Sequence, residues 1–241
     1  MKPSVSIVIP AFNEEENLEV TVREALSLLN DRFSSYEILI INDGSADRTA
    51  SVASQIAKLN PNIRFVNREK NMGLGYTVRQ GYELATKEYT IWVPGDGGMK
   101  KESLDSIFNV IGKADLVVPY IANPEFRSWT RRIISKTYIM ILNLLFGLKL
   151  RCYNGTILYR TKFLKATQSS TFGYFFFAET LIVLLKSGCS YVEVPTHHQQ
   201  RTPAKSKAFT IKNISEILKT AILLTWDVRV TRSKRITLNT Q

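Results

Sequence analysis

Three short loops carry acidic residues, and each loop directly follows an apolar run typical of a buried strand. They are residues 10–14 (PAFNE), 42–47 (NDGSAD) and 94–98 (PGDGG). In an open parallel sheet, ligands bind in the crevice beyond the carboxyl ends of the strands. The spacing therefore predicts one pocket at that edge of a sheet, and its acids suit a polar ligand and a divalent cation.

Two carboxylates are the strongest candidates within these loops. Asp43 lies at the tip of its strand, where an acid accepts hydrogen bonds from a ribose or a nucleobase; the alternative is a turn and helix cap only. Asp96 stands among three glycines, which leave the backbone open to a bulky ligand. Its oxygens suit Mg²⁺ or Mn²⁺ shared with a diphosphate, and the alternative is a glycine-rich turn with a solvated acid.

Two further segments indicate a phosphate ligand. Residues 71–75 (NMGLG) open a predicted helix, but their spacing matches neither a dinucleotide fingerprint nor a phosphate-binding P-loop. We expect Gly75 to let a phosphate-bearing ligand approach the backbone closely, with plain helix packing as the alternative. Residues 201–207 (RTPAKSK) form a basic loop after the last predicted strand. Its Arg and Lys side chains are suited to bind phosphate, and we favour this role over the alternative of a solvated loop without a ligand.

Composition and charge fit a globular α/β protein with an anionic partner. The 241 residues are 44% apolar and 22% charged, and the net charge is +11. Phosphorylated substrates and an acidic membrane surface agree with the motifs better than nucleic acid, for which no recognition signature is found. Two cysteines without metal-ligand spacing indicate a reducing compartment. With no apolar run near the roughly 18 residues of a membrane span and no signal peptide, we expect a cytoplasmic protein.

Strand-like and helix-like segments alternate through about residue 118, which predicts a mostly parallel sheet with helices on both faces. The expected strands are residues 4–9, 36–41, 62–66, 89–93 and 115–118. The expected helices are residues 16–30, 46–59, 74–85 and 101–111.

After Pro119 the pattern changes. The expected elements are an apolar helix at 133–148, a strand at 155–159, a helix at 177–186, a strand at 191–194 and a last helix at 211–228. We expect one domain over 1–210, divided near Pro119 into halves of residues 1–118 and 119–210, followed by an amphipathic helix and basic tail (211–241). The two apolar helices, flanked by cations, fit either an anionic membrane interface or packing on the sheet or in an oligomer.

Taken together, these motifs resemble family 2 glycosyltransferases, and within them the dolichol-phosphate mannose synthase branch of polyprenyl-phosphate glycosyltransferases. The resemblance extends from about residue 4 to residue 215. It rests on residues 10–17, 42–49, 71–75, Asp96 and 201–207. It implies a GT-A (Rossmann-like) glycosyltransferase domain over 1–210, a GDP- or UDP-sugar donor bound by the donor-binding half (1–118), Mg²⁺ or Mn²⁺, and inversion at the anomeric carbon. The implied acceptor is a polyprenyl phosphate or another lipid-linked acceptor, bound by the acceptor-binding half (119–210). The implied location is cytoplasmic and peripheral, on the inner face of the membrane.

The resemblance also implies roles for individual residues. The donor-binding residues would be Pro10, Glu14, Asp43, Gly75 and Asp96. Of these, Asp96 would be the metal ligand and the catalytic carboxylate. The residues implied to face the acceptor or the phosphates are Arg131, Arg132, Ser135, Arg201, Ser206 and Lys207.

The chain departs from the family pattern in three places. The family's Asp-x-Asp motif is Pro94-Gly95-Asp96 here, so one metal carboxylate is missing, and Gly98 replaces a further ligand. The Ser-Gly-Phe patch of the synthases is residues 154–156 (NGT), and the acid before it is Arg151. Many relatives that use a hydroxyl acceptor carry Glu-Asp where this chain has Glu179-Thr180. That last difference favours a phosphate acceptor, which needs no general base.

Three functions therefore remain open on the sequence. The first is a polyprenyl-phosphate glycosyltransferase, and the second is a family 2 enzyme that acts on a hydroxyl of a lipid-linked or cell-envelope glycan. The third is a binding subunit that kept the fold while its metal site eroded. A homo-oligomer or a membrane partner subunit is compatible with each.

Overall fold

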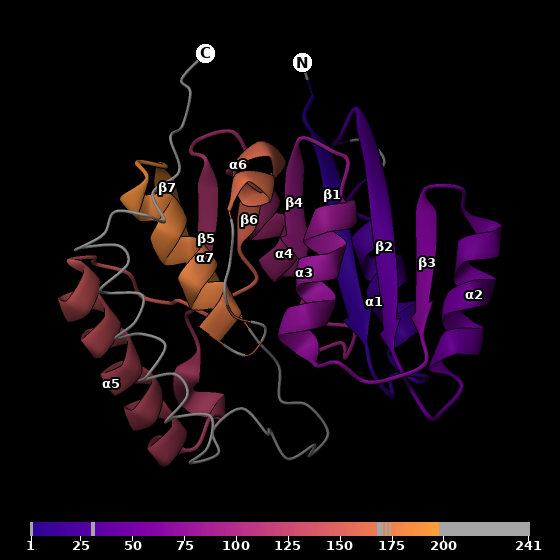
Figure 1. Ribbon diagram of the computed structural model, residues 1–241, viewed down its shortest axis with the longest axis horizontal. Coiled ribbons are helices and arrows are strands. Elements are labelled where there is room, and N and C mark those ends of the chain that lie inside the picture. The colour runs from indigo at the N-terminus through magenta and orange to yellow at the C-terminus, as the bar shows by residue number, and fades with distance from the viewer. Residues whose placement is uncertain (1, 30–31, 168–170, 172, 174, 198–241) are drawn as a thin grey trace.

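The computed structural model describes residues 2–29, 32–167, 171, 173 and 175–197. Its strands form a seven-stranded sheet in the order β3-β2-β1-β4-β6-β5-β7 (Figure 1). The strands are β1 (Ser4–Ala11), β2 (Ser35–Asp43), β3 (Ile63–Arg68), β4 (Tyr89–Trp92), β5 (Leu116–Ile121), β6 (Leu158–Arg160) and β7 (Tyr191–Thr196). The helices are α1 (Leu18–Leu26), α2 (Thr49–Leu59), α3 (Leu74–Leu84), α4 (Lys101–Phe108), the 3₁₀ turn η1 (Pro124–Phe126), α5 (Trp129–Phe146), α6 (Thr161–Ala166) and α7 (Phe175–Lys186).

The sheet is mostly parallel. β1 pairs in parallel with β2 and β4, β2 with β3, and β5 with β7, whereas β6 runs antiparallel to both β4 and β5. The parallel strands therefore end at one edge, which is the lower edge in Figure 1. The loops that follow β1, β2, β3 and β4 all leave the sheet there.

Both faces of the sheet are covered by helices, as the sequence predicts. In β1, Val8 faces a core shared with α3, α5, α6 and α7, whereas its neighbours Ile7 and Ile9 face a core shared with α1, α2 and α4. Figure 1 shows α3, α6 and α7 in front of the sheet. Because successive strand residues point to opposite faces and both faces are covered, the central strands are buried at nearly every position.

The element bounds differ from the predictions at several ends. α1 ends at Leu26 rather than near residue 30, because the amides of Leu28 and Leu29 bond three residues back, to Ala25 and Leu26, and so form turns. α5 begins at Trp129 rather than at residue 133, and it ends where Gly147 adopts a left-handed φ of 59°. The turn η1 and the short helix α6 were not predicted.

The described helices include none that is both long and apolar enough to cross a membrane. The expected last helix at 211–228, the basic tail and the division of the chain near residue 210 lie outside the described residues, so they stay predictions.

Candidate active site

The loops that follow β1 and β2 are locked to each other. Asn13 takes a left-handed φ of 58°. Its amide donates to Ser45 Oγ at 2.9 Å, and its side-chain Oδ1 accepts from the amide of Ala46 at 2.9 Å. The amide of Glu14 donates to Thr49 Oγ1 at 2.8 Å. The two motifs singled out in the sequence therefore form one unit at the carboxyl edge of the sheet.

Two further acids, Asp47 and Glu15, also hold these two loops together. Asp47 accepts from the amide of Glu15 at 3.2 Å and from that of Thr49 at 2.9 Å. Glu15 in turn accepts from the amide and the Nε of Arg48, at 3.0 Å each. Burial alone would raise the pKa of Asp47, but the hydrogen bonds from Thr49 and Glu15 outweigh it and lower that pKa. Glu15 and Asp47 thus shape the loops.

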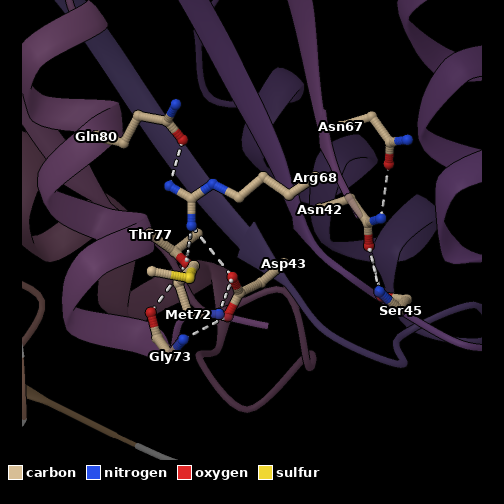
Figure 2. Close-up of polar contacts among 9 residues, drawn as sticks. All are labelled: Asn42, Asp43, Ser45, Asn67, Arg68, Met72, Gly73, Thr77 and Gln80. Atoms are coloured by element: carbon tan, nitrogen blue, oxygen red, sulfur yellow. Dashed lines mark hydrogen bonds and ion pairs between the residues drawn. The ribbon is translucent and has the colours of Figure 1, made fainter. Parts of the chain in front are cut away.

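Asp43 is buried at the end of β2, with 4% of its surface exposed. Its Oδ1 accepts from the amide of Met72 at 2.9 Å and from Nη1 of Arg68 at 3.1 Å, and its Oδ2 accepts from the amide of Gly73 at 2.8 Å (Figure 2). A carboxylate offers about four acceptor positions, so two of them hold the loop that leads into α3 and a third holds Arg68 at the end of β3. The strand end and the 69–73 loop are joined through this one side chain.

Arg68 is a site residue that the sequence reasoning missed. It lies directly across from Asp43 in the β2–β3 register, and its guanidinium also donates to Thr77 and Gln80 on α3 (Figure 2). The guanidinium carbon lies 4.5 Å from the centre of the Tyr76 ring. The signal that could have found it is an arginine at the end of one strand opposite an acid at the end of its neighbour.

Glycines bring the backbones of these loops close together. A Cβ at Gly44 would lie 2.7 Å from the amide nitrogen of Asn71, and Gly44 has a φ of +71°. A Cβ at Gly95 would lie 2.8 Å from the carbonyl oxygen of Pro10. The Pro94–Gly98 loop after β4 is therefore seated against the end of β1. Gly75 is buried in the first turn of α3.

Asp96 is half-buried in this loop, and its Oδ1 accepts from the amide of Gly98 at 2.9 Å. The loop is also tied to α1, since Thr21 Oγ1 donates to the carbonyl of Gly95 at 3.3 Å. Among the described residues, no three His, Cys, Asp or Glu side chains are grouped to hold a metal ion by themselves. A single carboxylate nevertheless fits Mg²⁺, which protein sites often hold by one or two carboxylates together with substrate phosphates.

The structure thus brings Pro10, Asp43 and Asp96 to one edge and places Glu14 and Gly75 beside them. Arg131, Arg132 and Ser135 are half-buried on the first half of α5, which begins shortly after β5 leaves the same edge. Arg201, Ser206 and Lys207 lie outside the described residues. The roles expected of all these residues in binding donor or acceptor stay predictions.

Glu179 and Thr180 lie inside the protein rather than at an open surface. Glu179 is 0% exposed and Thr180 is 2% exposed. Oε2 of Glu179 accepts from both the amide and the hydroxyl of Thr171, at 3.1 and 2.6 Å. The preceding turn of α7 is also packed, because the ring of Phe177 stacks on Trp92 at 5.1 Å between centroids. Glu179 therefore anchors the segment that leads into α7.

Arg151, where the synthases have an acid, lies over the end of β5. Its guanidinium carbon is 4.5 Å from the centre of the Tyr120 ring, and its Nε is 3.7 Å from Glu193 Oε2. The neighbouring Gly155 accepts from Trp92 Nε1 at 3.3 Å. This patch therefore adds a cation on the side of the sheet assigned to the acceptor.

The model of the family described as "Glycosyl transferase family 2" matches residues 6–168, which include the three acid-bearing loops and the whole of α5. This chain belongs to glycosyl transferase family 2. The match ends before Glu179 and before the basic loop at 201–207. The family 2 assignment therefore rests on the donor edge of the sheet and on the first part of the acceptor half.

Relatives of this family 2 chain include enzymes named for lipid phosphates. A dolichyl-phosphate beta-glucosyltransferase of Trichomonas vaginalis is 34% identical over 114 residues, which are 45% of this chain and 35% of the relative. The chain thus spans about a third of the length of such relatives. The polyprenol monophosphomannose synthase of Mycolicibacterium smegmatis is 27% identical over 217 residues, 83% of this chain and 79% of the relative.

The fold of this family 2 chain is also found among solved structures. Glucosyl-3-phosphoglycerate synthase of Mycobacterium tuberculosis, solved with Mg²⁺ and uridine diphosphate, superposes with a TM-score of 0.66 at 15% identity. The superposition covers 93% of this chain and 79% of that one. The expected GT-A architecture is confirmed.

Proposed function

We propose that this protein is an inverting glycosyltransferase that moves a sugar from a nucleoside-diphosphate sugar to a polyprenyl phosphate at the cytoplasmic face of a membrane. The observation that carries the proposal is the meeting of Pro10, Asp43 and Asp96 at one sheet edge, in loops locked to one another. A solved structure of the same fold holds Mg²⁺ and uridine diphosphate. Relatives named for dolichyl phosphate and polyprenol support the acceptor class.

The donor would lie across the carboxyl ends of β1, β2 and β4. Pro10, Glu14 and Asp43 would line the nucleoside, and Gly75 would allow the donor close to the start of α3. Asp96 would hold a divalent cation on the diphosphate, and a bound Mg²⁺ or Mn²⁺ ion there would neutralise charge that develops on the leaving group. Arg201, Ser206 and Lys207 would close over the same phosphates.

The transfer is a single displacement. An oxygen of the acceptor phosphate attacks the anomeric carbon while the bond from that carbon to the diphosphate oxygen breaks. The nucleoside diphosphate leaves with the bonding electrons. Because a phosphate monoester is anionic near neutral pH, no proton has to be removed from the nucleophile. Arg131, Arg132 and Ser135 would face this acceptor from α5.

The burial of Glu179 and Thr180 supports a phosphate acceptor over a hydroxyl. A general base must lie within hydrogen-bond reach of the proton it removes, and apo geometry alone does not exclude a candidate. Glu179, however, is fully buried and accepts two hydrogen bonds from Thr171. Thr180, where hydroxyl-using relatives carry Asp, has no carboxylate to offer.

The test is sugar transfer from labelled UDP-glucose and GDP-mannose to dolichyl or undecaprenyl phosphate with Mn²⁺. We expect a lipid product that extracts into organic solvent and is released by mild acid. Asp96→Asn should reduce the transfer to background because a neutral amide is a poor ligand for a hard cation. Asp105→Asn is the matched control, since Asp105 lies on α4 and pairs with Arg32 rather than lying in one of the site loops. It should transfer as the wild type does.

Two outcomes would contradict the proposal. Product that resists mild acid, formed on a hydroxyl of a lipid-linked glycan, would show the other acceptor class. Metal-dependent binding of nucleotide-sugar without any transfer would show a binding subunit.

A further inference from the structure

Arg68 is a nearly buried cation at the donor edge, and the proposed function assigns no role to it. Its side chain is 11% exposed, and that of its partner Asp43 is 5% exposed. The guanidinium bonds to the end of one strand and to two positions of a helix, and it lies over the Tyr76 ring. These contacts indicate that Arg68 fixes the positions of β2, β3 and α3 relative to one another.

The contacts close into a ring of four residues (Figure 2). Nη1 of Arg68 donates to Asp43 Oδ1 and to Thr77 Oγ1, at 3.1 Å each. The Thr77 hydroxyl donates to the carbonyl of Gly73 at 2.9 Å. The amide of Gly73 donates back to Asp43 Oδ2 at 2.8 Å, which closes the ring.

The ring determines the shape of the loop between β3 and α3. Residues 69–72 begin after Arg68 and end before Gly73, so both ends of this loop belong to the ring. In the middle, the backbone of Asn71 rests on Gly44, where a Cβ would come within 2.7 Å of the amide nitrogen. The side chains of residues 69–72 are exposed at the edge of the sheet. The backbone of this loop is thus held at both ends and at its contact with Gly44, while its side chains remain exposed.

We propose that Arg68 is a positioning residue of the donor site. It holds residues 69–73 and Asp43 in the arrangement that receives the nucleoside, and so it sets the affinity for the nucleoside diphosphate. This inference rests on the proposed function, which places the nucleoside beside Asp43. Arginine is required because Asp43, Thr77 and Gln80 take separate N–H groups of a planar fork, which the single ammonium of lysine does not reproduce.

Arg64 provides a matched control within the same strand pair. It lies on β3 and pairs with Glu37 of β2 at 3.3 Å, as Arg68 pairs with Asp43 at 3.1 Å. The Arg64 pair lies at the opposite end of the two strands, away from the loops. Arg64→Met therefore removes the same kind of cross-strand ion pair without touching the ring.

The first measurement is the affinity for UDP and for GDP with Mn²⁺, by calorimetry. We expect Arg68→Met to raise the Kd of whichever nucleotide binds by about tenfold, and Arg68→Lys to recover part of that loss. Arg64→Met should bind as the wild type does. In the transfer reaction, the KM for the donor should rise more than kcat falls, because Arg68 acts on donor binding and does not touch the reacting atoms.

The second measurement needs no ligand. The amides of Met72 and Gly73 should exchange hydrogen faster in Arg68→Met and at the wild-type rate in Arg64→Met. Unchanged exchange in Arg68→Met would overturn the inference, and so would faster exchange with unchanged nucleotide affinity. If Arg68→Met does not fold, Thr77→Val opens the ring without removing a charge. Unchanged exchange and affinity in Thr77→Val would likewise overturn it.

The two proposals fail in different ways. A wild-type protein that binds neither UDP nor GDP would contradict the proposed function and the affinity role of Arg68 together. The exchange rates of Met72 and Gly73 would still decide whether Arg68 holds the loop.

Discussion

Asp43 and Asp96 are both oriented by backbone amides of glycine-containing loops. Asp43 accepts from the amide of Gly73, and Asp96 accepts from that of Gly98. Hydrogen bonds from main-chain amides fix the orientation of a carboxylate, and at Asp43 the side chain of Arg68 adds to them. Because glycines surround both acids, the backbone comes close enough to reach them. The glycines are thus part of the site even though they carry no functional group.

A variant at Gly44 can test how much this close approach of two backbones matters. It combines a φ of +71° with a backbone contact, since an added Cβ would lie 2.7 Å from the Asn71 nitrogen. We expect Gly44→Ala to cost about 1 to 2 kcal/mol of unfolding free energy from backbone strain, and about 1 to 3 kcal/mol more from the clash. Urea denaturation gives the stability, and calorimetry with nucleotide and Mn²⁺ should show weakened binding because the 69–73 loop is displaced.

A variant at Gly188 distinguishes the cost of backbone strain from the cost of the clash. It has a φ of +96°, and a Cβ there would meet nothing within 4 Å. Gly188→Ala should therefore lose only the strain component and keep normal nucleotide affinity. Equal losses of stability and affinity in the two variants would show that the contact with Asn71 is unimportant.

At the scale of elements, β2 carries a buried acid near each end. Asp43 joins the site loops, whereas Glu37 joins the opposite edge, where it accepts from Ser6 Oγ at 2.7 Å and from Thr86 Oγ1 at 2.8 Å. Burial raises the pKa of Glu37, but hydrogen bonds from Ser6, Thr86 and Arg64 outweigh it and lower that pKa below its ordinary value. Glu37 therefore ties β1 and the α3–β4 connection to β2.

This lowered pKa makes the tie dependent on pH. Because the folded carboxyl has the lower pKa, its stabilisation is complete above the unfolded value and is lost as pH falls through the folded value. We expect the unfolding free energy of the wild type to decline between about pH 5 and about pH 3, and that of Glu37→Gln to be lower at about pH 7 but to decline less. Urea denaturation at each pH measures both.

Glu83→Gln is the control for this titration. Glu83 pairs with Arg79 on the surface of α3, and its side chain is 63% exposed. It should follow the wild-type pH profile. A Glu37→Gln profile parallel to the wild type would refute the assignment.

The βα units were predictable from the sequence, whereas the contacts between them were not. Strands such as β1 and β2 are apolar runs closed by turn residues, so their existence, order and exposed loops follow from local pattern. A strand was expected at 155–159, but β6 spans Leu158–Arg160 and runs antiparallel, which three residues are too few to indicate. The helix α6 has six residues, too few for a periodic pattern to accumulate. The ring at Arg68 depends on the register that sets Arg68 opposite Asp43. Because this register pairs two separate segments, the sequence of either segment alone does not reveal it.

At the scale of the whole molecule, α5 carries both exposed apolar side chains and exposed positive charge. Trp129, Ile133, Met140 and Leu144 recur at helical spacing and are 70%, 53%, 64% and 79% exposed. The exposed cation Lys136 lies on the same helix, in a chain of net charge +11. We expect a helix with such an exposed face to lie in the plane of an anionic interface, with its apolar side chains among the acyl chains and its cations reaching the headgroups.

We therefore expect the protein to float with vesicles that contain an anionic lipid at low salt, and to stay behind with zwitterionic vesicles. The paired change Met140→Glu and Leu144→Glu should abolish flotation, because it sets two acids against an anionic surface. Leu59→Glu is the control: Leu59 is 87% exposed but ends α2, far along the chain from α5. It should float as the wild type does. Wild-type protein that remains in the soluble fraction with anionic vesicles would contradict an interfacial α5. It would also weaken the case for an acceptor that must be reached from the bilayer surface.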